Sequence, residues 1–278
     1  MDHYLIQFFE RLRNTKTPDN TIDTYRTALQ QFFPNGEVNL TPEHIDKQLS
    51  TMKHLSPNSL RTKLSALAKL IKFIHRRELL PHYDELIDIC NSVKLEEKVM
   101  DTINNNQLEI LIETANSIRD KALIKLLATT GLRISELTAL NRKDISNNCL
   151  VVRSNEQNRT KNRKERIVYI PKCAMVLLTQ YMDTFNVNDA LFVSTIGERV
   201  SDNAVQKLLE RLGKKVGFKI TPHTLRRYYA TYQLQHGVNI RTLQLNMGHS
   251  SPTQTLKYVG NSPQEKAKSA EVFDMEEN

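Results

Sequence analysis

The sequence predicts a mainly α-helical protein, made of a small all-helical domain and a larger helical domain that contains a small antiparallel β-sheet. Three observations support this prediction. Apolar residues recur at helical spacing through most of the chain. Two short β-branched segments, 149–153 and 166–170, interrupt that spacing. A chain of 278 residues is long enough for two domains of ordinary size, each with its own core.

The first hundred residues are predicted to form helices separated by polar and proline-bearing turns. Apolar side chains recur at helical spacing over 5–12 and over 21–33, and Thr21 is expected to open the second of these helices. Thr41-Pro42 is typical of a capped helix start with proline in the first turn. A further amphipathic helix is expected from Ser56-Pro57 to Leu80.

Basic side chains on segment 56–80 make it a candidate nucleic-acid-binding helix. The candidate phosphate contacts are Arg61, Lys63, Lys69 and Lys72, because phosphate backbones attract lysine and arginine. The alternative is a solvated helix whose lysines serve solubility, which is the commoner explanation for one such helix. The net charge of +8 and the pI of about 9.3 suit a protein that meets a polyanion, and most of the basic excess follows residue 100.

A domain boundary is expected where a short charge run leads into a polar stretch. This places a linker at 96–106, between a domain at 1–95 and a domain at 107–278. Beyond the linker, 108–115 and 120–129 are predicted helices. The two β-branched segments then flank a polar, basic loop, which is typical of an antiparallel ribbon, and helices return from Ala174 onward.

The cysteines give no sign of a disulfide framework or a zinc site. Cys90, Cys149 and Cys173 are far apart and in no metal-ligand spacing, so we expect reduced thiols and no bound metal. The sequence also lacks a phosphate-binding Walker loop and any stretch of 18 uncharged apolar residues. A cytoplasmic protein without a cofactor and without a membrane partner is expected.

Two arginines are candidate clamps for a phosphate. Phosphodiester cleavage builds negative charge on the non-bridging oxygens, and the planar guanidinium of arginine stays charged and can bind two of them. Arg133 follows Thr130-Gly131-Leu132, and Arg226 lies three residues after His223, on the same face of a predicted helix. Taken alone, Arg133 could instead cap the end of the preceding helix.

Five short motifs in this order resemble the tyrosine recombinase (phage integrase) family, specifically its two-domain, Xer-like members. The motifs lie at 130–137, 160–166, 221–226, 247–251 and Tyr258. The resemblance covers nearly the whole chain and is most specific over 120–260. It implies the DNA breaking-rejoining enzyme fold, with a SAM-like core-binding domain at 1–95 and a catalytic domain at 107–278.

The resemblance also implies roles for individual residues. The catalytic set would be Arg133, Lys161, His223, Arg226, His249 and the nucleophile Tyr258. Glu136 would support Arg133, unless it is only a first-turn acid of a helix. Lys161 would be the general acid, with Lys164 as the alternative, and Thr160 and Asn162 stand where glycine is common in the family. Arg159, Arg163 and Lys164 would contact DNA; alternatively these three and Arg166 are only phosphate-tracking charges on a solvated loop.

The activity implied is site-specific recombination of duplex DNA through a 3'-phosphotyrosyl intermediate and a Holliday junction. Such an intermediate conserves the energy of the phosphodiester, so neither metal nor ATP is needed. Four protomers would act at paired inverted-repeat sites, with or without a partner recombinase. A type IB topoisomerase-like or hairpin-forming resolvase activity, and a catalytically silent DNA-binding regulator, are the alternatives.

Overall fold

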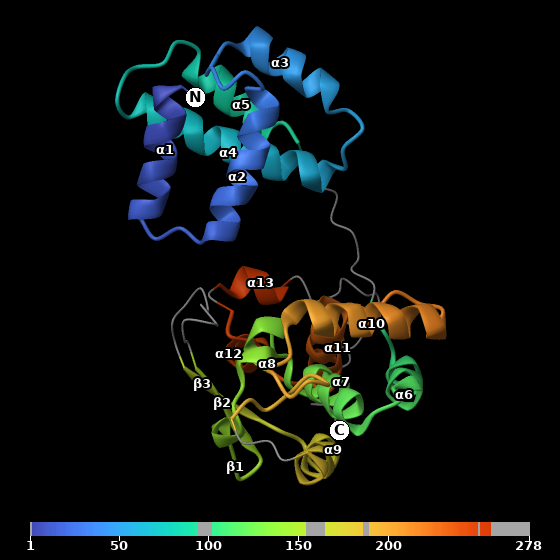
Figure 1. The fold of residues 1–278 in the computed structure, drawn as a ribbon. Coiled ribbons are helices and arrows are strands. Elements are labelled where there is room, and N and C mark those ends of the chain that lie inside the picture. Colours follow the sequence, from blue (N-terminus) through green and yellow to red (C-terminus); the bar gives the residue numbers. More distant parts are fainter. Residues whose placement is uncertain (1, 94–101, 154–164, 186–188, 250, 257–278) are drawn as a thin grey trace, which may run out of the picture. The chain divides into compact units, whose positions relative to one another are not determined.

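The protein forms two compact units, Met1–Lys98 and Val99–Asn278, each with a hydrophobic core. The computed structural model describes residues 2–93, 102–153, 165–185, 189–249 and 251–256. These residues are mainly helical and include one small antiparallel sheet, which confirms the predicted fold class (Figure 1). None of the helices in these ranges is long and apolar enough to cross a membrane.

The first unit is a group of helices around one core. They are α1 (His3–Asn14), α2 (Asp19–Phe32), α3 (Pro42–Thr51), α4 (Pro57–His75) and α5 (Tyr83–Asn91). The apolar residues that recur at helical spacing face inward, and Leu29, Phe32, Leu67 and Ile71 are each at most 1% exposed. Helix α4 packs against both α2 and α5, so it forms the middle of the unit.

Local side-chain signals mark the starts of α3 and α2 in different ways. The predicted start of α3 is confirmed, because the Thr41 hydroxyl accepts a hydrogen bond from the backbone N–H of His44 and Pro42 begins the helix. Helix α2 begins at Asp19, two residues before the predicted Thr21. Asp19 supplies an acidic side chain to the first turn, where the helix dipole favours negative charge.

Helix α4 ends at His75, so its predicted extension to Leu80 is wrong. The backbone N–H groups of Arg77 and Glu78 both bind the carbonyl of Ile74, which closes the helix with a turn. The imidazole of His75 then accepts a hydrogen bond from the backbone N–H of Leu80 at 3.2 Å. A local turn satisfied by a side chain is therefore what stops the amphipathic pattern from continuing as a helix.

The candidate DNA-contacting residues of α4 lie mostly on its solvent side. Arg61, Lys69 and Lys72 are exposed and Lys63 is half-buried. The ammonium of Lys69 lies 4.9 Å from the centre of the Tyr25 ring, at cation–π distance. The position of these residues is compatible with phosphate contact and also with simple solvation, so their role stays a prediction.

The second unit contains the remaining elements. The helices are α6 (Asn105–Thr114), α7 (Ile118–Thr130), α8 (Ile134–Ala139), the 3₁₀ helix η1 (Arg142–Asp144), α9 (Lys172–Thr184), α10 (Asp202–Val216), α11 (Pro222–Gln235), α12 (Ile240–Met247) and α13 (Pro252–Leu256). Helix α7 is apolar over most of its surface and packs against both α9 and α11 (Figure 1). The helix predicted at 120–129 is therefore confirmed, and its apolar residues lie in the core of this unit.

Helix α6 begins three residues before the predicted start at Leu108. The side chain of Asn104 accepts from the backbone N–H of Gln107, and the side chain of Gln107 accepts from the backbone N–H of Asn104. This reciprocal capping box satisfies two backbone donors and allows the helix to begin at Asn105.

The sheet has the order β1-β2-β3, with β1 at Ile145–Ser146, β2 at Cys149–Val152 and β3 at Arg166–Tyr169. Both pairs of neighbouring strands are antiparallel, and Val152 pairs with Arg166 in the register of β2 and β3. The predicted ribbon of β2 and β3 is confirmed, and β1 is an additional strand. Asn147 and Asn148 connect β1 to β2 with positive φ angles, as a two-residue hairpin turn requires.

Candidate active site

Arg133 and Glu136 meet at the start of α8. Arg133 stands at the N-cap position, and its backbone N–H donates to one carboxylate oxygen of Glu136 at 2.9 Å. Its guanidinium donates to the other oxygen, also at 2.9 Å. The Glu136 side chain is fully buried, whereas that of Arg133 is 36% exposed. The carboxylate therefore orients a guanidinium that still reaches solvent.

The guanidinium of Arg133 also contacts the end of α12. It donates to the carbonyl oxygens of Met247 at 3.5 Å and Gly248 at 3.2 Å. The end of the preceding helix α7 is instead closed by Gly131, whose φ is +63°. Arg133 thus joins the start of α8 to a segment more than a hundred residues later in the chain.

Arg226 lies beside Arg133 but is buried, with 4% exposure. It lies on α11, which begins with a capping box between Thr221 and Thr224. One of its guanidinium nitrogens donates to the carbonyl of Gly131, and the other donates to the carbonyl of Met247 at 2.7 Å. Because Met247 also accepts from Arg133, both predicted clamps converge on one carbonyl group.

His223 is on the first turn of α11, three residues before Arg226, as the spacing predicted. The residue is exposed. Partial desolvation and the positive charges of Arg226, Arg227 and Arg133 lower the pKa of His223 below its usual value. The neutral imidazole, which offers one donor and one acceptor, is therefore favoured near neutral pH.

His249 follows the left-handed Gly248 that ends α12. Its backbone N–H donates to the carbonyl of Gln244, and its Nδ1 lies 2.8 Å from the hydroxyl of the buried Thr255 on α13. Burial, followed by the charges of Arg226 and Arg133, lowers the pKa of His249 to about 4. The imidazole is thus neutral at physiological pH.

Arg166 is a site residue to which the sequence assigned no catalytic role. It begins β3, is only 12% exposed, and donates to both oxygens of Glu136, at 3.0 and 2.6 Å. Its Nε donates to the carbonyl of Asn246 at 2.8 Å. The alternative that placed Arg166 among solvated loop charges is therefore wrong, because three of its N–H groups bind buried or backbone partners.

The charge of Glu136 depends on these two arginines. Burial raises the pKa of Glu136, but the hydrogen bonds and charges of Arg166 and Arg133 outweigh it, so the pKa lies below the usual value. Together with Arg226, the group contains three guanidinium groups and one carboxylate, and therefore carries net positive charge. Such a group can bind two oxygens of a phosphate through guanidinium hydrogen bonds, and it can stabilise the negative charge that develops on the phosphate oxygens during the reaction.

Other predicted site residues lie outside the described ranges or in the other unit. Lys161, Arg159, Arg163, Lys164 and Tyr258 are outside the described residues, so their predicted roles are not tested. The candidate contacts Arg61, Lys63, Lys69 and Lys72 belong to the first unit. No group of three or more His, Cys, Asp or Glu that could hold a metal ion occurs among the residues that the structure describes.

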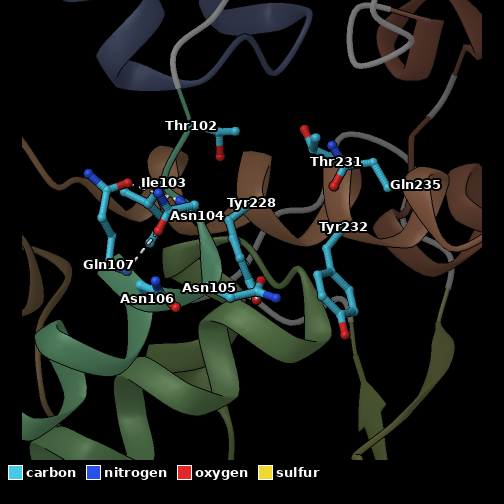
Figure 2. Close-up of a pocket in the computed structure, with 10 residues that line it drawn as sticks. All are labelled: Thr102, Ile103, Asn104, Asn105, Asn106, Gln107, Tyr228, Thr231, Tyr232 and Gln235. Carbon is cyan, nitrogen blue, oxygen red and sulfur yellow. Dashed lines mark hydrogen bonds between the residues drawn. The ribbon is translucent and has the colours of Figure 1, made fainter. Parts of the chain in front are cut away.

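A cavity of about 530 Å³ lies elsewhere in the second unit, beside α6 and α11 (Figure 2). It is lined mainly by amide and hydroxyl side chains: Thr102, Ile103, Asn104, Asn105, Asn106, Gln107, Tyr228, Thr231, Tyr232 and Gln235. The hydroxyl of Tyr228 donates to the side chain of Asn105 at 2.9 Å, which ties α11 to the start of α6. Neither clamp arginine lines this cavity, so it is separate from the candidate active site.

The model of the phage integrase family matches residues 95–265, more than half of the chain. The chain belongs to this family. Two curated relatives are tyrosine recombinases: XerC of Chlamydia trachomatis, 30% identical over 255 residues that cover 86% of this chain and 76% of XerC, and XerD of Staphylococcus aureus, 30% identical over 271 residues that cover 87% and 89%.

A solved structure shows that the recombinase also shares the family's fold. The Tn1549 transposon integrase, in a complex with a circular intermediate DNA, matches with a TM-score of 0.80 at 19% identity, over 98% of this chain and 99% of that one. The recombinase is therefore an enzyme of the tyrosine class that performs site-specific DNA recombination. The described residues that its motifs predicted for the site are Arg133, Arg226, His223 and His249, with Glu136 as the supporting residue.

Proposed function

We propose that this recombinase cleaves and rejoins duplex DNA with Tyr258 as its nucleophile. The observation that carries the proposal is the convergence of Arg133 and Arg226 on the carbonyl of Met247, two residues before His249. Three separate segments of the chain thus gather two guanidinium groups and an imidazole. Phosphoryl transfer needs such fixed cations around the non-bridging oxygens.

The reaction would pass through a 3'-phosphotyrosyl intermediate. The Tyr258 phenolate attacks phosphorus, the P–O bond to the 5' oxygen breaks, and Lys161 donates a proton to that departing oxygen. Arg133 and Arg226 bind the non-bridging oxygens, and the neutral His223 and His249 donate hydrogen bonds. Attack by a 5' hydroxyl from the other duplex reverses these steps and releases Tyr258, so no metal or ATP is consumed.

The domain roles and partners follow from the same proposal. Residues 1–95 would bind the core site, 96–106 would link the domains, and 107–278 would form the catalytic domain. The Tn1549 relative binds DNA, and duplex DNA with paired inverted repeats is the substrate that we propose here. Four protomers, with or without a partner recombinase, would exchange strands through a Holliday junction. The cytoplasmic location expected from the sequence remains a prediction.

The experiment starts from the DNA that the protein binds covalently in cells. Adducts from cells that express the protein are trapped and their DNA is sequenced, and two copies of the recovered site are then placed on one plasmid. Deletion or inversion between the copies supports recombination. Relaxation of the plasmid without exchange would instead support a topoisomerase, and site binding without an adduct would support a silent regulator.

A further inference from the structure

Arg166 occupies a position that the proposed roles do not explain. Its side chain is 12% exposed, and its guanidinium makes two hydrogen bonds to Glu136 and one to the carbonyl of Asn246. Because these bonds engage its guanidinium, we do not assign Arg166 the role of a phosphate ligand. They connect β3, the first turn of α8 and the end of α12, which are the elements around the two clamp arginines.

We propose that Arg166 is a positioning residue that keeps Arg133 available for the phosphate, by binding the Glu136 carboxylate through both of its oxygens. The inference rests on the proposed function and extends it to a residue outside the predicted catalytic set. Arg166 is not itself placed in contact with DNA.

The charges explain why a second arginine is needed. Glu136 is fully buried, and a buried carboxylate is costly unless it is paired. If Arg133 were its only partner, the pair would be neutral and the guanidinium of Arg133 would be held by the carboxylate. With Arg166 present, a second guanidinium offsets the charge of the carboxylate, so Arg133 keeps its orientation and the three groups together keep a net positive charge.

The backbone near His249 leaves room for this arrangement. A side chain on Gly248 would place its Cβ 2.8 Å from the Nη1 of Arg166 and 3.0 Å from its Cζ. Glycine also accepts the φ of +63° found at this position. The three arginines at positions 133, 166 and 226 donate to the carbonyls of residues 246 to 248, where the helix dipole favours cations.

The test measures first-strand cleavage by the full-length protein under saturating DNA. The probe is a nicked duplex that carries the site recovered from wild-type adducts. Arg166→Gln should slow cleavage about 100-fold, because misplacement of a phosphate-binding group by about 1 Å has an effect of this size. Its affinity for the uncleaved duplex should stay unchanged, since in this proposal Arg166 acts through Glu136 and not on the DNA.

The matched control is Arg153→Gln, on the same hairpin. Arg153 is 45% exposed and makes its 2.9 Å ion pair with Asp144 instead of Glu136, so the substitution removes the same charge without removing an ion pair of Glu136. It should cleave at the wild-type rate. A wild-type rate for Arg166→Gln, or an equal loss in the Arg153→Gln control, would overturn the inference.

A double variant separates positioning from a general loss of structure. If Arg166 acts through Glu136, the loss in Arg166→Gln combined with Glu136→Gln should be smaller than the product of the two single losses. A loss equal to that product would overturn the inference. Should Arg166→Gln fail to fold, the double variant still leaves no unpaired buried charge, and it should then cleave as fast as Glu136→Gln alone.

The cleavage reaction of the wild-type protein distinguishes failure of this inference from failure of the function on which it rests. If the wild type forms no adduct, the proposed function fails and the inference fails with it. If the wild type cleaves and the Arg166 variants cleave equally well, only the inference fails.

Discussion

The tight packing of Gly131 gives a prediction whose size can be worked out from the structure. Gly131 closes α7 with a φ of +63°, and a Cβ at this position would lie 2.3 Å from Cδ1 of the buried Tyr229. Gly131→Ala therefore meets two separate costs. The left-handed backbone costs an L-residue about 1–2 kcal/mol, and forcing extra volume into a packed core costs about 1–3 kcal/mol.

Gly217→Ala is the matched control for this substitution. Gly217 ends α10 in the same left-handed conformation, with a φ of +80°, but no atom lies within 4 Å of its added Cβ. The control therefore contains the backbone cost without the steric one. Both variants gain the same stabilisation from a less flexible unfolded chain, so this contribution cancels in their difference.

The expected difference between the two variants is the steric cost, about 1–3 kcal/mol. For a unit of this size, each kcal/mol shifts Tm by about 2–4 °C, so Gly131→Ala should melt about 2–12 °C below Gly217→Ala. Calorimetry of the full-length protein measures both, because Gly131 and Gly217 belong to the same compact unit. Equal melting temperatures would refute the close packing of Tyr229 under Gly131.

Three further predictions concern the site and its surroundings. The pKa of His249, about 4, lies below the usual value of about 6.5, so the unfolded chain binds more protons than the folded protein between these two pH values. The free energy of unfolding should therefore fall as the pH falls from 6.5 to 4. Melting curves should show a less steep fall in His249→Asn. Arg226→Lys should lower adduct formation by about 100-fold or more at unchanged DNA binding. The reason is that one ammonium group cannot replace the two-armed guanidinium that binds the carbonyls of Gly131 and Met247. A near-wild-type adduct yield would contradict this prediction. Tyr228→Phe removes the hydrogen bond to Asn105 and should lose about 0.5–1.5 kcal/mol of stability in chemical denaturation; unchanged stability would contradict a structural role for this bond.

The helices could be predicted because their signals are local. The apolar spacing of α4 and the Thr41-Pro42 start of α3 lie within a few residues of the structure that they specify. The end of α4 at His75 could not be predicted from this spacing. It depends on a hydrogen bond from the backbone N–H of Leu80 to the imidazole of His75. Strand β1 was missed for a different reason: a two-residue strand has no periodicity, and Asn147-Asn148 was the one turn signal available.

In the candidate site, too, local pairs of residues could be predicted and long-range pairs could not. Arg133 with Glu136 and His223 with Arg226 are each three residues apart, so helical geometry places each pair together. Arg166 and Glu136 are thirty residues apart and belong to a strand and a helix, so their ion pair comes from tertiary packing. The shared hydrogen bonding of Arg133 and Arg226 to the carbonyl of Met247 could not be predicted either, because every residue has a backbone carbonyl and the sequence does not show which one accepts.

The most direct test of the account is to identify the residue that carries the DNA. Covalent adducts from the wild type and from Tyr258→Phe are digested with nuclease and trypsin and examined by mass spectrometry. The account predicts a nucleotide on the tryptic peptide 258–266 of the wild type, attached through the Tyr258 oxygen, and no adduct in Tyr258→Phe. A nucleotide on another residue, or adducts that persist in Tyr258→Phe, would contradict it.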